Sequence, residues 1–121
     1  MSRKNVKTNS GLVALIDDLK AHSRSSGTAL WRDVAERLER SNRNWARPNI
    51  SRLTRYAPTD SVVLVPGKLL GSGEVVGSPT VAAYSFSAQA REKIEQAGGK
   101  ALTIPQLIET QPDGAGVFIL G

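Results

Sequence analysis

Five arginines stand close together near the middle of the chain, with no acidic residue among them. They are Arg40, Arg43, Arg47, Arg52 and Arg55. A guanidinium group binds phosphate through paired hydrogen bonds. A run of one charge sign also repels itself unless a polyanion neutralises it. The run therefore predicts binding to RNA or DNA.

Polar and aromatic residues are interleaved with these arginines. Asn42, Asn44 and Asn49 can bridge to sugar or phosphate oxygens. Trp45 is a candidate for stacking on an unpaired base or a ribose. The alternative is a solvated basic loop with the Trp45 ring folded into the core.

The basic residues are concentrated in the first half of the chain. Residues 1–56 hold 12 Lys/Arg and 5 Asp/Glu, a net charge of +7, and residues 57–121 hold 4 and 6, a net charge of −2. Arg24 belongs to the basic half and is a further candidate phosphate ligand. Residues 1–9, which include Arg3, Lys4 and Lys7, show no apolar periodicity. They predict an extended basic arm, disordered when alone.

The sequence gives little support for catalysis or metal binding. The chain has no cysteine and one histidine, His22, which excludes Cys-based metal sites, thiol nucleophiles and His-rich sites. His22 lacks a partner for acid–base catalysis and is expected at a helix end or against RNA. Asp33–Arg37 and Glu36–Arg40 stand four residues apart and predict ordinary surface ion pairs. We expect no enzymatic activity, no cofactor, no metal and no small-molecule substrate.

The glycine-rich segment 66–77 is a candidate phosphate-binding loop, but it does not match the sequence patterns of such loops. Lys68 is followed by Leu69, where a magnesium-binding Ser or Thr is needed. Gly71 and Gly73 are followed by Gly77, one residue late for a dinucleotide motif, and no helical pattern follows. We expect tight turns between short strands.

Apolar spacing predicts a helical first half. One helix begins at Ser10 and ends at Gly27, and a second covers 28–40 with Thr28 as its cap. Residues 40–47 form a loop. A short third helix has Pro48 in its first turn and ends at Pro58. Its predicted apolar stripe is Ile50, Leu53, Tyr56 and Ala57.

The second half predicts short strands and helices in alternation. Pro66-Gly67 is expected to turn the chain after the first strand. Ser87 and Thr103 are expected to cap helices, the latter through a capping box. The expected strands are 62–65, 69–70, 74–76, 80–86, 101–102 and 117–120, and the expected helices are 88–97 and 103–109.

No apolar run approaches the roughly 20 residues that cross a bilayer, and the basic start lacks the apolar core of a signal peptide. We therefore expect a cytoplasmic protein without a membrane partner. We predict a basic arm (1–9) and a single domain (10–121). The domain would consist of a basic helical part (10–57) and a mixed α/β part (58–121).

The second half resembles a known signature. Lys68-Leu69-Leu70-Gly71-Ser72-Gly73-Glu74-Val75, Val81, Phe86-Ser87-Ala88-Gln89-Ala90, Ile94 and Gly98 resemble the pattern shared by bacterial large-subunit ribosomal protein fifteen and archaeal–eukaryotic protein eighteen-e. The basic half is similar to the eighteen-e branch at Glu36-x-Leu38, Ser41 and Asn49-Ile50-x-Arg52-Leu53. It departs from that branch at Asn42, Trp45 and Pro48. The resemblance covers about residues 10–120, and the length resembles archaeal members.

This resemblance implies an α/β fold of irregular β-β-α turns wound as a short superhelix, preceded by helices. It also implies a structural role in the large ribosomal subunit, bound to its ribosomal RNA and to neighbouring ribosomal proteins. A ribosome-independent RNA- or DNA-binding protein is the alternative. Lys68 matches the family motif and joins the candidates. The RNA-binding candidates are Arg3, Lys4, Lys7, Arg24, Arg40, Arg43, Asn44, Trp45, Arg47, Asn49, Arg52, Arg55 and Lys68.

Overall fold

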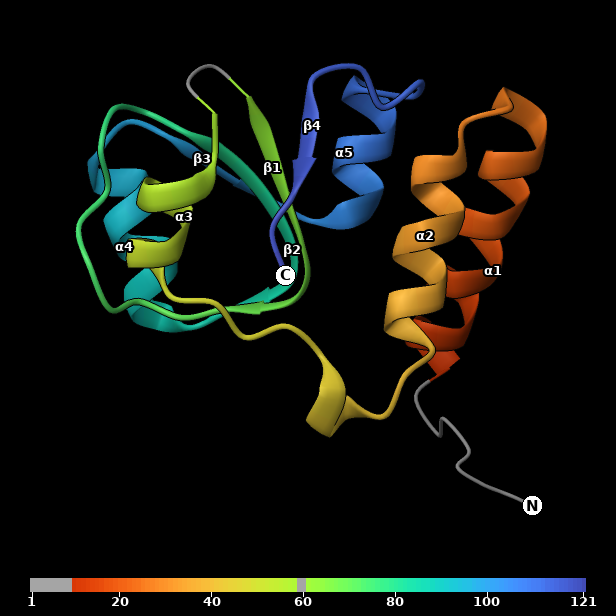
Figure 1. Ribbon diagram of the computed structural model, residues 1–121, viewed down its shortest axis with the longest axis horizontal. Helices are drawn as coiled ribbons and strands as arrows, with labels where there is room; N and C mark the ends of the chain where they lie inside the picture. The colour runs from red at the N-terminus through yellow and green to blue at the C-terminus, as the bar shows by residue number, and fades with distance from the viewer. Residues whose placement is uncertain (1–9, 59–60) are drawn as a thin grey trace.

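The computed structural model describes residues 10–58 and 61–121. The first half is helical and the second half alternates strands and helices, in the predicted order (Figure 1). The elements are α1 (Ser10–Ser26), α2 (Ala29–Leu38), η1, a 3-10 turn (Asn42–Asn44), α3 (Ile50–Tyr56), β1 (Val62–Leu69), β2 (Thr80–Phe86), α4 (Ala88–Gln96), β3 (Lys100–Leu102), α5 (Ile104–Thr110) and β4 (Val117–Ile119).

The four strands form one parallel sheet in the order β3-β2-β1-β4. Parallel neighbours require a crossover between them. α4 lies in the crossover from β2 to β3, and α5 lies in the connection from β3 to β4, which stand at opposite edges of the sheet. The connection from β1 to β2 is an irregular segment, residues 70–79, that contains no helix.

Helices cover both faces of this sheet. In β1, Leu64 packs into a core cluster with residues of α1, α2 and α5, whereas Val63 and Val65 pack into a second cluster with residues of α3 and α4. Figure 1 shows the resulting layers, with α3 and α4 on one side of the sheet and α5, α2 and α1 on the other. Burial on both faces explains why Val62–Val65 is an unbroken apolar run.

Local signals set several boundaries as predicted. Gly27 has a φ of 73°, and its N–H donates to Ser23 O at 2.9 Å, which ends α1. The Ser87 hydroxyl accepts from Ala90 N at the start of α4. Thr103 and Gln106 form the expected capping box of α5. Thr28 stands at the N-cap of α2, but its side chain makes no capping bond.

The predicted turn at Pro66-Gly67 is wrong, because β1 continues through both residues to Leu69. The register against β2 shifts between Val65 and Lys68, and such a bulge tolerates a proline in a strand. Gly67 is required there because a Cβ atom would collide with Ala46 O. Leu69 therefore ends a long strand rather than beginning a short one.

Three further predictions are corrected. Residues 74–76 form no strand. α3 begins at Ile50 with Asn49 at its N-cap, so Pro48 lies before the helix rather than in its first turn. Tyr56 is 53% exposed and does not share the buried stripe of Ile50 and Leu53. The winding of the β-β-α turns as a superhelix and the extended arm stay predictions, and residues 1–9 lie outside the described residues.

Candidate nucleic-acid interface

The arginine-rich segment is held against the end of β1. Ala46 pairs with Gly67 and Asn49 with Leu70, both in parallel orientation. Lys68 N donates to Ala46 O at 3.0 Å, and Leu70 N donates to Pro48 O at 2.8 Å. Since β2 occupies the other edge of β1 at Lys68, this segment continues the edge along which β4 pairs.

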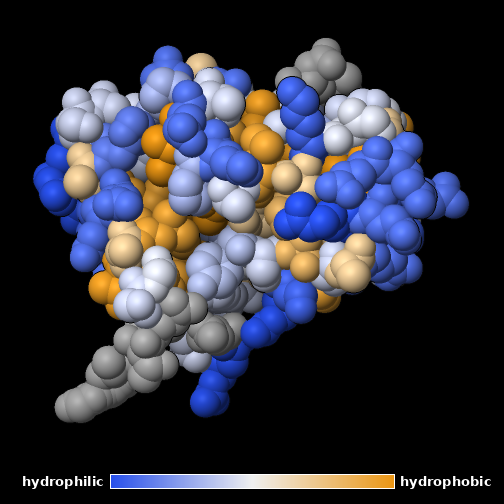
Figure 2. Space-filling model, turned by 180° about the vertical axis from the view of Figure 1, so that it is seen from behind, coloured by the Kyte–Doolittle hydropathy of each residue, from blue (hydrophilic) through white to orange (hydrophobic). Residues whose placement is uncertain are grey.

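This pairing brings the end of the arginine-rich segment next to Lys68 of β1. We call Arg40, Arg43, Arg47 and Lys68 the loop face. The register places Arg47 beside Lys68, the one exposed residue of β1. Arg40 and Arg43 are exposed on the chain leading into the segment. Figure 1 shows η1 at the same end of the helical pair as the start of α1. In Figure 2 hydrophilic side chains project from this lower edge.

A second basic surface, the α3 face, consists of Arg52, Arg55 and Tyr56. The guanidinium carbons of Arg52 and Arg55 lie 5.2 and 5.9 Å from the centroid of the Tyr56 ring. Cation–π contact holds both guanidinium groups on the exposed side of the helix while leaving their N–H donors available to phosphate. Sequence reasoning missed this cluster because it assigned Tyr56 to the buried stripe; the spacing of Tyr56 one and four residues after two arginines could have indicated it.

Three basic side chains of the helical pair form ion pairs. In α1 and α2, Lys20 pairs with Glu39 at 2.8 Å, Arg32 with Glu36 at 3.2 Å and Arg37 with Asp33 at 3.1 Å. The predicted Asp33–Arg37 pair is confirmed, whereas Glu36 pairs with Arg32 rather than with Arg40. Within residues 10–58 and 61–121, Arg43, Arg52, Arg55 and Lys68 form no ion pair. Their charge is therefore available to a polyanion.

Arg24 lies apart from both surfaces. It is exposed in the last turns of α1, beside a shallow hollow of about 530 Å³ that Lys20, Arg32 and Glu36 also line. Figure 1 places this end of α1 opposite to η1. The structure therefore does not bring Arg24 together with the other candidates.

Trp45 packs against the core. Its indole N–H donates to Leu38 O at 3.2 Å and Arg40 O at 3.0 Å. Its ring meets Tyr84 edge-on, with centroids 5.0 Å apart, and it contacts the core cluster of α1, α2 and α5. These contacts favour the core alternative for Trp45 and anchor the loop face to the helical pair.

The two candidate asparagines differ. Asn44 is exposed, and its backbone N–H donates to Ser41 O at 2.8 Å to close η1. Asn49 is half-buried, and its Oδ1 accepts from Ser72 N at 3.1 Å. The Asn49 side chain therefore ties two segments of the protein together.

His22 serves to fasten a loop. Its Nε2 lies 2.6 Å from Pro112 O, and because a carbonyl only accepts, this nitrogen carries a hydrogen. Trp31 Nε1 donates to the same oxygen at 3.0 Å, and the two rings meet edge-on at 5.8 Å. His22 and Trp31 together hold the segment before β4 against the helical pair.

The glycine-rich segment presents carbonyls rather than phosphate-binding N–H groups. Lys93 Nζ donates to Gly71 O and to Gly73 O, both at 2.7 Å. Sequence reasoning missed Lys93, because no local pattern links α4 to a segment about 20 residues earlier.

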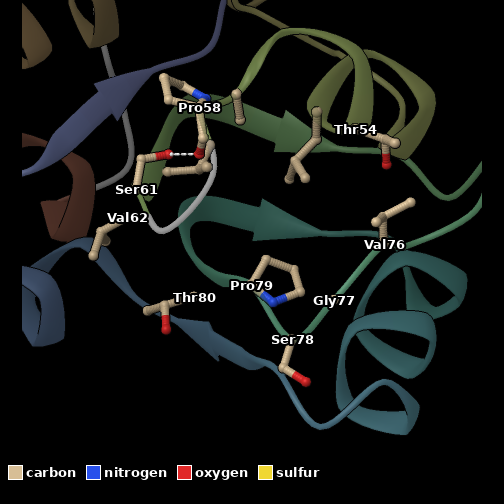
Figure 3. Close-up of a pocket in the computed structure, with 12 residues that line it drawn as sticks. Thr54, Pro58, Ser61, Val62, Val76, Gly77, Ser78, Pro79 and Thr80 are labelled. Atoms are coloured by element: carbon tan, nitrogen blue, oxygen red, sulfur yellow. Dashed lines mark hydrogen bonds between the residues drawn. The ribbon is translucent and has the colours of Figure 1, made fainter.

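A separate hollow of about 370 Å³ lies between α3, the starts of β1 and β2, and residues 76–79. Figure 3 shows apolar and hydroxyl side chains around it, with Ser61 donating to Pro58 O at 2.7 Å. Among the described residues that line it, none is titratable. Within residues 10–58 and 61–121, no cluster of potential metal ligands occurs. Across the same ranges, no helix has the length and apolar character to cross a membrane.

The chain matches the model of a known protein family. The model of a family described as ribosomal protein 60S L18 and 50S L18e matches residues 1–121.

Individual relatives are similar over almost their whole length. The chain is 50% identical over 112 residues to large ribosomal subunit protein eL18 of Methanothermobacter thermautotrophicus, covering 93% of each chain. It is 50% identical over 114 residues to eL18 of Haloarcula marismortui, covering 94% of this chain and 97% of the relative. It is 46% identical over 120 residues to eL18 of Methanoregula boonei, covering 99% of each.

Proposed function

We propose, given that this chain belongs to the family of ribosomal proteins 60S L18 and 50S L18e, that its loop face and α3 face bind large-subunit ribosomal RNA through phosphate contacts. Members of this family are structural constituents of the large ribosomal subunit and are not enzymes. The predicted place in the cytoplasmic large subunit agrees with this membership. The alternative of a ribosome-independent nucleic-acid-binding protein is therefore set aside.

The observation that carries the proposal is the pairing that sets Arg47 beside Lys68, with Arg40 and Arg43 exposed on the chain just before it. The pairing of residues 46–49 with the end of β1 fixes the backbone beneath these side chains. A fixed array of cations binds the phosphate backbone by releasing condensed counterions, without reading sequence. Shape recognition of helical RNA suits such an array.

The α3 face would supply a second line of phosphate contacts. Arg52 and Arg55 make no ion pair within the described residues, and both lie over Tyr56. The contacts of Arg24, Asn44, Trp45 and Asn49 with RNA stay predictions. So does the threading of Arg3, Lys4 and Lys7 between RNA helices. We further propose that the acidic half, the scaffold, faces partly away from RNA or toward a basic neighbouring protein.

Sedimentation in gradients that separate ribosomal subunits tests the proposal. Tagged wild-type protein, expressed in its own cells, should track with the large subunit in a one-to-one ratio in moderate salt. The combined Arg40→Ala, Arg43→Ala, Arg47→Ala and Lys68→Ala variant should move toward the top of the gradient. A matched control removes four cations that lie outside the loop face: Lys20, Arg32, Arg37 and Arg91.

The control variant should stay with the large subunit, provided that circular dichroism shows it folded. If the loop-face variant sediments with the large subunit as completely as wild type does, the loop face does not contact the ribosomal RNA.

A further inference from the structure

Residues 70–74, in the connection from β1 to β2, have carbonyl groups that face two neighbouring helices in alternation. Leu70 O accepts from Ile50 N at 3.0 Å, and Ser72 O accepts from Ser51 N at 3.0 Å. Glu74 O accepts from the Thr54 hydroxyl at 2.7 Å. Every second carbonyl of residues 70–74 therefore faces α3, as expected for an extended backbone.

The remaining carbonyls of this segment face α4. Gly71 O and Gly73 O both accept from Lys93 Nζ, at 2.7 Å each. The Lys93 side chain is half-buried. The single ammonium group of Lys93 thus binds both carbonyls that face α4. Because the donor is charged, these hydrogen bonds are of the strong, charge-assisted kind.

The two glycines allow this close packing. A Cβ atom on Gly71 would lie 2.7 Å from the Gln89 side chain of α4, and one on Gly73 would lie 2.5 Å from Ser51 N of α3. Gly73 also has a φ of 113°, which disfavours other residues. The Gly-Ser-Gly sequence therefore lets residues 70–74 fit between the two helices.

α3 depends on this segment for its place in the fold. It has seven residues, too few to be stable as an isolated helix. No side chain caps its start, and its first two N–H groups instead donate to Leu70 O and Ser72 O. The segment at 70–74 thus substitutes for a cap and sets the position of the helix.

We propose that Lys93 is a positioning residue for the α3 face: by fixing residues 70–74, it sets where Arg52 and Arg55 meet the RNA backbone. The proposal rests on the proposed function of the α3 face. It assigns Lys93 no contact with RNA. Its ammonium group acts through the segment and through α3.

A double-mutant cycle separates this role from a general loss of stability. We would measure binding of the full chain to transcribed large-subunit ribosomal RNA for wild type, Lys93→Met, Arg52→Ala/Arg55→Ala and the combined variant. Lys93→Met should weaken binding about tenfold in the wild-type background and very little where both arginines are already absent, because the two changes act on one contact. Lys100→Met, at an exposed lysine of β3, is the charge-matched control and should behave as wild type.

Each other result overturns the proposal in a recognisable way. Equal weakening in both backgrounds means that Lys93 acts by general stability, and no weakening in the wild-type background means that it does not position α3. If Arg52→Ala/Arg55→Ala alone binds as wild type, the α3 contact itself is wrong. If Lys93→Met does not fold, Lys93→Gln, which keeps one donor group, takes its place in the same cycle.

Discussion

Arg43 and Arg47 extend from the loop face, and both side chains are exposed. Replacing both with Ala should weaken binding to large-subunit ribosomal RNA and reduce its dependence on salt. The logarithmic salt slope should fall by about 0.7–0.9 for each phosphate that the variant no longer neutralises. Filter binding over a salt series measures this slope.

The matched control for that pair is Arg32→Ala with Arg91→Ala. These arginines pair with Glu36 and Glu95 on their own helices, at 3.2 and 3.9 Å. The control removes the same charge and should leave the slope nearly unchanged. A slope that is unchanged in the Arg43/Arg47 variant would show that neither residue binds phosphate.

His22 has a structural role at the same scale. Its removal should lower the free energy of unfolding by about 1–2 kcal/mol, because Pro112 O then has one donor fewer and the Trp31 ring has no edge-on partner there. Urea unfolding of His22→Ala measures this value. Arg24→Ala, an exposed position in the same helix, should change it by less than about 0.5 kcal/mol. Equal values for the two variants would contradict the fastening role.

The sequence predicted which basic residues lie at the surface, but not which partner an individual side chain contacts. The run of basic residues is visible in the sequence itself, so Arg43 and Arg52 could be proposed directly, whereas Lys68 was proposed from the family resemblance. Trp45 and Asn49 could not be assigned, because their partners Tyr84 and Ser72 come from other elements. Lys93 was missed for the same reason.

At the scale of elements, boundaries with local causes were predicted well. β2 spans Thr80–Phe86 and α4 follows Ser87, as expected. β1 was cut short in the prediction because Pro66-Gly67 is usually a turn. The strand continues because Ala46, about 20 residues away, pairs with Gly67, and because Lys68 and Leu69 pair with β2.

The capping box of α5 gives a direct test of a local signal. Thr103→Ala removes the acceptor for Gln106 N, 3.2 Å away. Such a cap contributes about 1 kcal/mol to the free energy of unfolding, which thermal or urea unfolding will detect. Thr110→Ala, at the other end of the helix, should cost less, because its hydroxyl donates to carbonyls that are already hydrogen-bonded in the helix. A larger cost at Thr110 would contradict the capping argument.

Alanine substitutions at two glycines with positive φ distinguish the cost of backbone strain from the cost of a steric clash. Gly77→Ala meets no neighbour within 4 Å, so it should cost only the strain of a left-handed residue, about 1 kcal/mol. Gly73→Ala adds a clash with Ser51 N at 2.5 Å and should cost clearly more, about 3 kcal/mol. Equal costs in urea unfolding would mean that residues 70–74 do not pack tightly on α3.

At the scale of the whole molecule, the sheet separates two layers of helices. One face carries α3 and α4, with the segment that positions the α3 face. The other carries the α1–α2 pair, on which Trp45 anchors the loop face (Figure 1). The parallel order of the strands was not predicted, whereas the alternation of strands and helices followed from the pattern of the sequence. The pairing of residues 46–49 with β1 did not, because register across separate segments depends on tertiary contacts.

The chain contains no cysteine, so a single introduced cysteine can carry an iron chelate that cleaves nearby RNA. Ser41→Cys, at an exposed residue beside the loop face, should direct strong hydroxyl-radical cleavage of large-subunit ribosomal RNA within assembled subunits. Glu109→Cys, on the exposed side of α5, should direct much less. Strong cleavage from position 109 with none from position 41 would contradict binding through the loop face.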